Sequence, residues 1–213
     1  MFNKVLIANR GEIAVRIIQS VRDAGYLSVA VFSEADRDAA HVHLADESVC
    51  IGPAQVNQSY LVIANILKAA ASTGTDAIHP GYGFLSENAE FARACNDAGI
   101  TFIGPSPEAI DLMGNKRVAK NRMLDAGVPC IPGYQGEDQS NPTLLEEAAR
   151  IGYPLMVKAA AGGGGRGMRL QLSEEGLAGA IDSARSEALN AFGSDQLILE
   201  RAITDGRHIE IQV

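Results

Sequence analysis

The chain has 213 residues, 46% of them hydrophobic, which is enough for one or two globular domains that each bury a core. Its formal net charge of −8 argues against nucleic acid as the main partner, because phosphate backbones are bound by net-basic surfaces. The apolar run Val5–Ala8 is too short for a signal peptide or a membrane span, and the three cysteines form no CxxC pair. We therefore predict a soluble, cytoplasmic protein with reduced thiols, no membrane partner and no nucleic-acid partner.

The first half of the chain alternates short apolar strands with amphipathic helices, which is typical of a parallel sheet covered by helices. Strands are expected at residues 4–8, 29–32, 48–51, 76–79 and 101–103, with helices after the first strand, at 61–71 and at 89–98. The first turn, Asn9–Glu12, has one glycine where a dinucleotide site needs three. We predict a Rossmann-like layer that binds no nucleotide.

The second half reads as a smaller α/β unit. Two helices, at 105–114 and from 114 to about 126, precede residues 127–142, whose Gly, Pro and polar content we interpret as a connection between lobes. Beyond it we expect helices at 143–151 and 174–191, and strands at 155–158, 168–172, 196–201 and 208–213. The last strand alternates strictly, so His208 and Glu210 share a polar face that is a candidate site wall.

A glycine loop follows Lys158. Five of the six positions from 162 to 167 are glycine, and Arg166 is the sixth. Glycine loses more backbone entropy on folding than any other residue, so the run indicates a need for positive φ or for close approach to a ligand. Successive free N–H groups form an anion nest, to which Lys158 and Arg166 add positive charge. A flexible hinge is the alternative, and we favour a phosphate-binding loop.

Two familiar phosphate motifs do not fit this loop. Gly162–Gly167 matches the dinucleotide fingerprint by letter, but that motif needs a following helix, and Met168–Leu172 alternates like a strand. A Walker loop needs Lys and then Ser or Thr where this chain has Met168 and Arg169. The order strand, loop, strand predicts a hairpin flap that closes over a nucleotide.

Three weaker signals stand outside the loop. His79–Asn88 follows a parallel strand at its carboxyl end, where open sheets place ligands, and Ser86 is a candidate cap for the next helix. His41 and His43 could hold a metal, but a solvated helix face is the interpretation we favour. Lys116 begins a helix, where the macrodipole disfavours a cation, so it weakly indicates an anionic partner.

Five stretches together resemble the biotin carboxylases of the ATP-grasp superfamily, and they cover the whole chain in order: Leu6–Ala14, His79–Asn88, Met113–Lys116, Lys158–Met168 and His208–Val213. The resemblance implies that ATP, with Mg²⁺, activates bicarbonate as carboxyphosphate, and that the carboxyl group passes to biotin on a carrier protein. It implies as partners a biotin carboxyl carrier protein or domain and a carboxyltransferase subunit or domain, and a homo-oligomer when complete. The enzyme could belong to an acyl-CoA, pyruvate or urea carboxylase.

The resemblance also implies roles and domains. Residues 1–113 would be the Rossmann-like N-terminal domain and 114–213 the start of an ATP-grasp domain, with a lid subdomain at about 131–203. His208 and Glu210 would face the active centre as catalytic candidates. The implied nucleotide contacts are Lys116, Lys158, Gly164, Gly165, Arg166, Glu200, Arg201, Ala202, Ile203 and His208.

The chain stops at Val213, about halfway through the catalytic unit of the family it resembles. The resemblance places the Mg²⁺ carboxylates, the bicarbonate and biotin arginines and the base in the other half, so we predict no metal ligands here. We expect the 213-residue chain not to carboxylate biotin by itself. A nucleotide-binding fragment or module with no chemistry of its own is the alternative.

Overall fold

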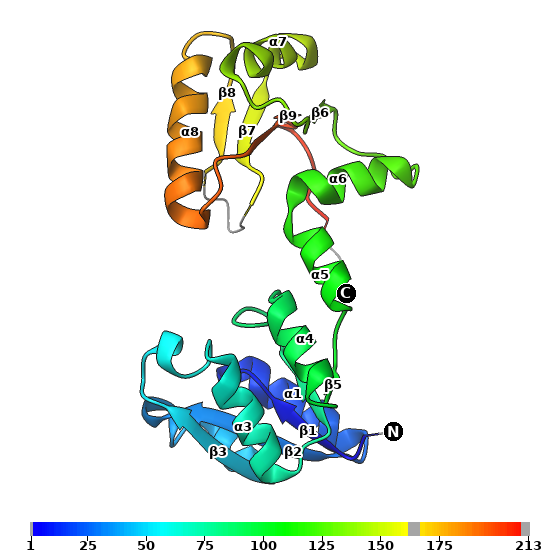
Figure 1. Cartoon of the computed structure of the whole chain (residues 1–213), viewed down its shortest axis with the longest axis vertical. Helices are drawn as coiled ribbons and strands as arrows, with labels where there is room; N and C mark the ends of the chain where they lie inside the picture. Colours follow the sequence, from blue (N-terminus) through cyan, green and yellow to red (C-terminus); the bar gives the residue numbers. More distant parts are fainter. Residues whose placement is uncertain (1, 162–166, 210–213) are drawn as a thin grey trace. The chain divides into compact units, whose positions relative to one another are not determined.

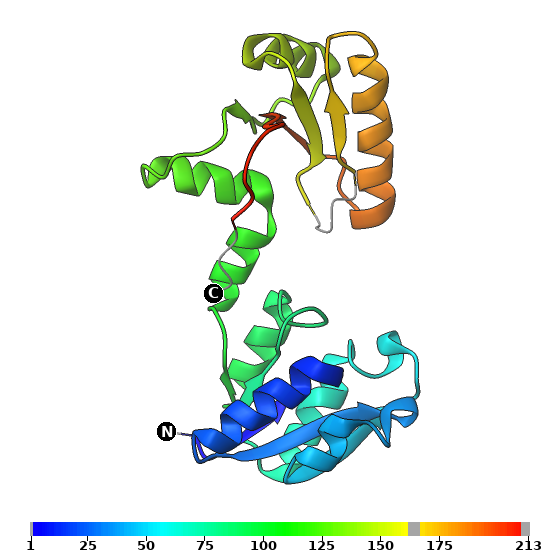
Figure 2. The same cartoon turned by 180° about the vertical axis from the view of Figure 1, so that it is seen from behind.

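The computed structural model describes residues 2–161 and 167–209. The chain divides into two compact units, Met1–Asp111 and Leu112–Val213, each with its own sheet (Figures 1 and 2). The first sheet is parallel and the second antiparallel, which confirms the predicted α/β fold class. Within the described ranges, no helix is long and apolar enough to cross a membrane.

The first unit is built on five parallel strands in the order β3-β2-β1-β4-β5. The strands are β1 (Lys4–Ile7), β2 (Leu27–Ser33), β3 (Glu47–Gly52), β4 (Ala77–His79) and β5 (Thr101–Phe102). The helices are α1 (Gly11–Asp23), α2 (Ala40–Leu44), α3 (Ile63–Thr73) and α4 (Ala89–Asp97), with 3₁₀ turns at Glu34–Asp36 and Val56–Gln58. Each strand expected from the sequence is present, with small shifts at its ends.

Both faces of this sheet are buried, as parallel sheets require. Leu6 and Val29 pack with Ile66 of α3 on one face. Val5 and Ile7, which alternate with Leu6 along β1, pack with α1 on the other face. The alternation of one strand therefore supplies two separate cores, and α1 lies opposite α3 and α4 (Figure 1).

The second unit has a four-stranded antiparallel sheet in the order β6-β9-β7-β8. The strands are β6 (Gly133–Tyr134), β7 (Leu155–Ala159), β8 (Arg169–Gln171) and β9 (Leu197–Arg201). The helices are α5 (Pro107–Gly114), which spans the division between the units, α6 (Lys116–Asp125), α7 (Asn141–Ile151) and α8 (Leu177–Phe192). The side chains of α7 and α8 pack on one face of this sheet.

The interpretation of residues 127–142 as a connection between lobes is wrong, because this stretch lies inside the second unit. Gly133 and Tyr134 form β6 and pair with Glu200 and Leu199 of β9. A two-residue strand carries too little periodicity to be seen in sequence. Gly133 is required by close packing, since a Cβ atom there would overlap the carbonyl oxygen of Leu199.

Two predictions about single residues in the first unit are also wrong. His41 is not on a solvated helix face: its side chain is fully buried, and its Nε2 lies 3.3 Å from the carbonyl oxygen of Val31. The cap of α4 is Asn88 rather than Ser86, since Asn88 Oδ1 accepts a hydrogen bond from the backbone N–H of Phe91 at 2.8 Å. A short helix next to a sheet buries one of its faces, which the two-histidine pattern alone could not indicate.

The strand predicted at 208–213 is only partly within the described residues. His208 and Ile209 are exposed and lie in no strand, and residues 210–213 lie outside the described ranges. In the described ranges no group of three or more His, Cys, Asp or Glu residues could hold a metal ion. His41 and His43 are therefore not part of such a group.

Candidate functional site

The sheet of the second unit has one face covered by α7 and α8, and we call the opposite face the open face. Leu155 and Val157 of β7 point into the core under α7 and α8, so Lys158 points to the opposite face. In the register of β7 and β9, Lys158 is opposite Ile198, which makes Glu200 its diagonal neighbour on the same face. Lys158 Nζ donates a hydrogen bond to Glu200 Oε2 at 2.5 Å.

Helix α6 brings a second cation to the same carboxylate. Lys120 Nζ donates to Glu200 Oε1 at 2.7 Å, and the Lys120 side chain is only 9% exposed. Each oxygen of Glu200 therefore accepts from one ammonium group. Lys120 lies one helical turn after Lys116, so both side chains project from the same side of α6.

The two lysines govern the ionisation of Glu200. Burial alone raises the pKa of its carboxyl, but the hydrogen bonds and charges of Lys120 and Lys158 outweigh burial and hold the pKa below its ordinary value. Glu200 is therefore a fixed negative charge at neutral pH, placed between two cations.

Backbone contacts fix the start of α6 beside Ala160, which directly follows β7. The N–H of Lys116 donates to the carbonyl oxygen of Ala160 at 3.0 Å, and the N–H of Ala160 donates to Gln196 at 2.9 Å. Asn115 caps the helix by accepting hydrogen bonds from the N–H groups of Arg117 and Val118. The helix start and Ala160, far apart in sequence, are thus held together.

A cavity of about 460 Å³ opens where α6 meets the open face of the sheet. Three lysines and one glutamate line it, which gives two net positive charges. Most of the remaining wall is apolar and includes three methionines. The full lining is Met113, Lys116, Ala119, Lys120, Met123, Cys130, Ile131, Lys158, Met168, Ile198 and Glu200. An apolar wall with clustered cations suits a ligand with a flat apolar part and an anionic part.

The structure brings only some of the predicted site residues together. Lys116, Lys158 and Glu200 line the cavity, whereas four others are not among its lining residues: Arg201, Ala202, Ile203 and His208. Gly164, Gly165, Arg166 and Glu210 lie outside the described residues.

The residues after Glu200 make contacts of their own. Arg201 turns toward α7, where its Nη1 donates to the carbonyl oxygen of Ile151 at 3.2 Å. The N–H of Ala202 donates to Pro154 at 2.8 Å. Ile203 and His208 are exposed. The predicted adenine contacts at these positions remain predictions.

Lys120 is a cavity-lining residue that sequence reasoning missed. Its spacing of four from Lys116 was visible, but a lysine on a helix usually lies in solvent, and the pattern does not show that α6 packs against the open face of a sheet. The apolar wall was missed for the same reason, because Met113, Ile131 and Met168 come from segments that meet only in the folded unit.

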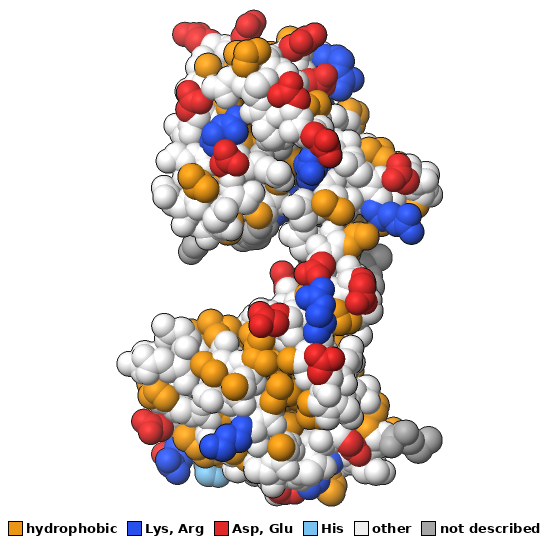
Figure 3. Space-filling view, in the orientation of Figure 1, with side chains coloured by type: hydrophobic (Ala, Val, Ile, Leu, Met, Phe, Trp, Pro, Cys, Tyr) orange, Lys and Arg blue, Asp and Glu red, His pale blue; other side chains and the backbone are white. Residues whose placement is uncertain are grey.

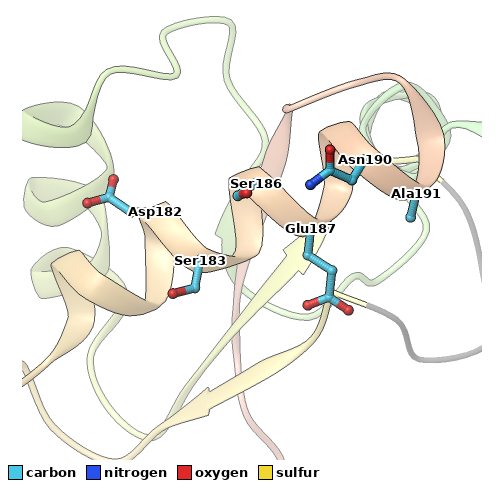
Figure 4. Close-up of a pocket in the computed structure, with 6 residues that line it drawn as sticks. All are labelled: Asp182, Ser183, Ser186, Glu187, Asn190 and Ala191. Atoms are coloured by element: carbon cyan, nitrogen blue, oxygen red, sulfur yellow. The ribbon is translucent and has the colours of Figure 1, made fainter.

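A larger and more open hollow, about 760 Å³, runs along α8 and is lined by residues of that helix alone (Figure 4). Its lining is Asp182, Ser183, Ser186, Glu187, Asn190 and Ala191, without a cation. The Glu187 carboxylate accepts hydrogen bonds from the N–H of Gly167 at 3.1 Å and from Arg169 Nη1 at 2.9 Å. This hollow is less suited to an anion than the cavity beside α6.

The surface of the second unit does not offer another strongly basic area in the view of Figure 3, where acidic and basic side chains are interspersed over it. Several basic side chains are paired, such as Arg150 with Glu147 and Arg169 with Glu187. Of the two hollows described above, the one beside α6 therefore fits an anionic ligand better.

The loop His79–Asn88 of the first unit is held by a buried side chain. Asn9 Nδ2 donates to the carbonyl oxygens of Pro80 and Tyr82 at 2.9 and 2.8 Å. Gly81 has φ 67°, and a Cβ atom there would lie 2.7 Å from Asn9 Nδ2, so glycine is required for this close approach. The loop is a fixed structure at the carboxyl end of β4, with the Tyr82 side chain exposed.

Comparison with known proteins assigns both halves of the chain to described families. Residues 1–110 match the biotin carboxylase N-terminal domain, and residues 115–213 match the carbamoyl-phosphate synthase L chain ATP binding domain. Biotin carboxylase 1 of Bacillus subtilis is 53% identical over 100% of this chain and 47% of its own length. The biotin carboxylase of Allochromatium vinosum is 56% identical over 100% of this chain and 48% of its own.

Solved structures are similar along nearly the whole chain. A biotin carboxylase βγ-ATP complex from Campylobacter jejuni has a TM-score of 0.92 at 48% identity and covers 96% of this chain and 46% of that one. The biotin carboxylase domain of Hydrogenobacter thermophilus 2-oxoglutarate carboxylase, a dimer with MgADP, ADP and bicarbonate, has a TM-score of 0.88 at 47% identity, with 95% and 45% covered. The chain spans about half the length of these two curated biotin carboxylases, and it belongs to the biotin carboxylase family.

Proposed function

We propose that this chain supplies the nucleotide-binding part of a biotin carboxylase, which uses ATP and bicarbonate to carboxylate biotin on a carrier protein. The observation that carries the proposal is the cavity beside α6, which is lined by Lys116, Lys120 and Lys158 together with a largely apolar wall. It is supported by the solved relatives, of which one holds βγ-ATP and another MgADP.

The residues of the cavity suit the two parts of a nucleotide. Lys158 and Lys116 neutralise phosphate charge, and the methionine and isoleucine side chains take the adenine ring. Phosphoryl transfer from ATP to bicarbonate needs positioning and charge neutralisation more than covalent help from the protein. The lysine side chains of the cavity can supply both. The covering role of Gly164, Gly165 and Arg166 is part of the proposal, as are the adenine contacts of Glu200–Ile203 and the active-centre roles of His208 and Glu210.

Magnesium does not fit the described residues by themselves, because they contain no group of three or more His, Cys, Asp or Glu that could hold an ion. We assign no step to it in this chain. Biotin and bicarbonate contacts are likewise not assigned to the described residues.

The domain and partner assignments are also proposals. We propose domains at 1–113 and 114–213, with a lid at about 131–203. Relatives named methylcrotonoyl-CoA carboxylase subunit alpha support a carrier protein and a carboxyltransferase as partners, and the Hydrogenobacter thermophilus dimer supports a homo-oligomer. The cytoplasmic location remains a prediction; Cys50, Cys95 and Cys130 are all free thiols.

Bicarbonate-dependent ADP release with biotin and Mg²⁺ tests the activity. Two proteins are compared: the 213-residue chain, and the same chain joined to the C-terminal half of the Allochromatium vinosum biotin carboxylase. We expect turnover from the joined protein only. Turnover of the short chain at a similar rate would show that the catalytic residues are misplaced. A folded joined protein that binds MgATP without turnover would favour a nucleotide-binding module, which the carboxylase names of the relatives do not favour.

A further inference from the structure

In the proposed function Lys158 contacts both the carboxylate of Glu200 and a nucleotide phosphate. Its Nζ lies 2.5 Å from Glu200 Oε2, yet Lys158 also belongs to β7, the strand that precedes the glycine loop in the sequence. An ammonium group that turns toward a phosphate weakens or gives up its contact with Glu200. The carboxylate would then lose one of its two cations inside a largely dry site, where its side chain is only 12% exposed.

A buried carboxylate without a partner is strongly unfavourable, because its lost hydration is not replaced. Lys120 provides the replacement in advance. It contacts the other oxygen, Oε1, at 2.7 Å, and its side chain is 9% exposed, against 22% for Lys158. Of the two cations, Lys120 is therefore the enclosed one and Lys158 the more accessible one.

The surroundings of Lys120 fit a fixed position. A Cβ atom on Gly133 of β6 would lie 2.8 Å from Lys120 Nζ, so the glycine leaves room for the ammonium group beside β9. The helix that carries Lys120 is tied to the sheet at its start by the hydrogen bond from Lys116 N–H to Ala160. Both the head group and the backbone of Lys120 are thus held in place.

We propose that Lys120 is a positioning residue that keeps Glu200 ionised and in place while Lys158 exchanges its carboxylate contact for a nucleotide phosphate. The proposal rests on the proposed function, in which Lys158 contacts phosphate. Lys120 acts through Glu200 and does not itself touch the nucleotide. The exchange moves no proton and breaks no covalent bond.

Calorimetric titration of the 213-residue chain with MgATP tests the effect on binding. Lys120→Met is expected to raise the Kd by about 10-fold, which corresponds to about 1.4 kcal/mol. Lys120→Arg keeps the charge and the reach to Oε1, so it should restore most of the affinity. Arg122→Met removes an exposed cation from the same helix. Because Arg122 does not line the cavity, the Kd should stay within about twofold.

A double-mutant cycle separates positioning from direct contact. If Lys120 acts through Glu200, Lys120→Met should change the Kd by less than about twofold once Glu200→Gln is present. Independent, additive losses would overturn the proposal, because they would mean that Lys120 affects the nucleotide by another route. A lowered unfolding temperature with an unchanged Kd for Lys120→Met would overturn it too, since that is a structural role only.

A titration of the Glu200 carboxyl by carbon NMR tests the same role without nucleotide. With Lys158→Met, Lys120 remains and the carboxyl pKa should stay below its ordinary value; with Lys120→Met it should be higher than in Lys158→Met. The reverse order would overturn the proposal. If the unaltered chain binds no MgATP, the nucleotide-binding function fails, and this titration still decides whether Lys120 is the cation that holds Glu200.

Discussion

The two units treat buried polar side chains differently. In the first unit the buried polar residues include Asn9 and Ser33, which carry no charge, and His41, whose pKa is lowered by burial so that the neutral form is favoured. In the second unit, and among all the residues the structure describes, Lys120 is the one lysine, arginine or acidic residue in the buried class. It pairs with Glu200, and Glu200 pairs with Lys158.

The difference separates architecture from ligand binding. A neutral buried group with hydrogen-bond partners holds loops and strands in place without the large desolvation cost of a buried charge. A buried charge pair is a poor source of stability, because its desolvation offsets its attraction. We therefore infer that the first unit uses its polar core as scaffold, whereas the second retains buried charge beside the cavity that we propose as the nucleotide site.

The largest expected effect follows from removing the shared carboxylate. Glu200→Ala leaves Lys120 and Lys158 without it, and we expect the second unit to lose about 3 kcal/mol of unfolding free energy. Glu187→Ala breaks a more exposed pair with Arg169 and should cost less than about 1 kcal/mol. Hydrogen exchange resolved by region, with urea unfolding, measures both. Equal losses for the two variants would remove the distinction between the buried and the exposed charge pairs of the second unit.

A smaller effect is expected from the neutral network of the first unit. Asn9→Ala removes the donor for Pro80 and Tyr82, and we expect about 2 kcal/mol of destabilisation, because the buried hydrogen bond to Pro80 and the partly buried one to Tyr82 are both lost. Hydrogen exchange in residues 79–88 should quicken while β7 and β9 are unaffected. Asn96→Ala, at an exposed position of α4, is the control and should change stability by less than about 0.5 kcal/mol. Faster exchange in β9 would contradict the independence of the two networks.

The smallest of the expected effects is a difference between the two units in how their stability falls in mild acid. Burial lowers the pKa of His41 and of His79, so their folded pKa values lie below the ordinary 6.5. A group with a depressed folded pKa contributes stability that is present above the ordinary value and is lost as the pH falls below it. For Glu200 the same sign applies, but the loss begins only below its ordinary 4.5.

Between pH 7 and pH 5 we therefore expect the hydrogen-exchange protection factors, which are corrected for the slower intrinsic exchange in acid, to fall in the first unit before the second. His41→Gln should reduce the difference, and His43→Gln, at an exposed position, should not. Earlier loosening of the second unit would show that its charge pairs, rather than the buried histidines, govern the response to mild acid.

Sequence reasoning succeeded where one segment carries its own pattern. Short apolar runs, each followed by an amphipathic helix, predict parallel strands such as β1, and the apolar run that ends at Lys158 predicts β7. It failed where burial depends on a distant segment. Lys120 is buried by β9, and His41 by β2. β6 is defined only by its pairing with β9.

The central claim is that the open face of the second unit binds a nucleotide through Lys158. The most direct measurement is the Kd of the 213-residue chain for MgATP, compared between Lys158→Gln and Arg169→Gln. Arg169 is a cation on the adjacent strand β8, but it is not among the residues that line the cavity.

We predict that Lys158→Gln raises the Kd about 10- to 100-fold, because it removes a charge-assisted hydrogen bond to phosphate, and that Lys116→Gln has a smaller effect. Arg169→Gln should stay within about twofold. An unchanged Kd for Lys158→Gln, or an equal loss for Arg169→Gln, would contradict the placement of the nucleotide on this face.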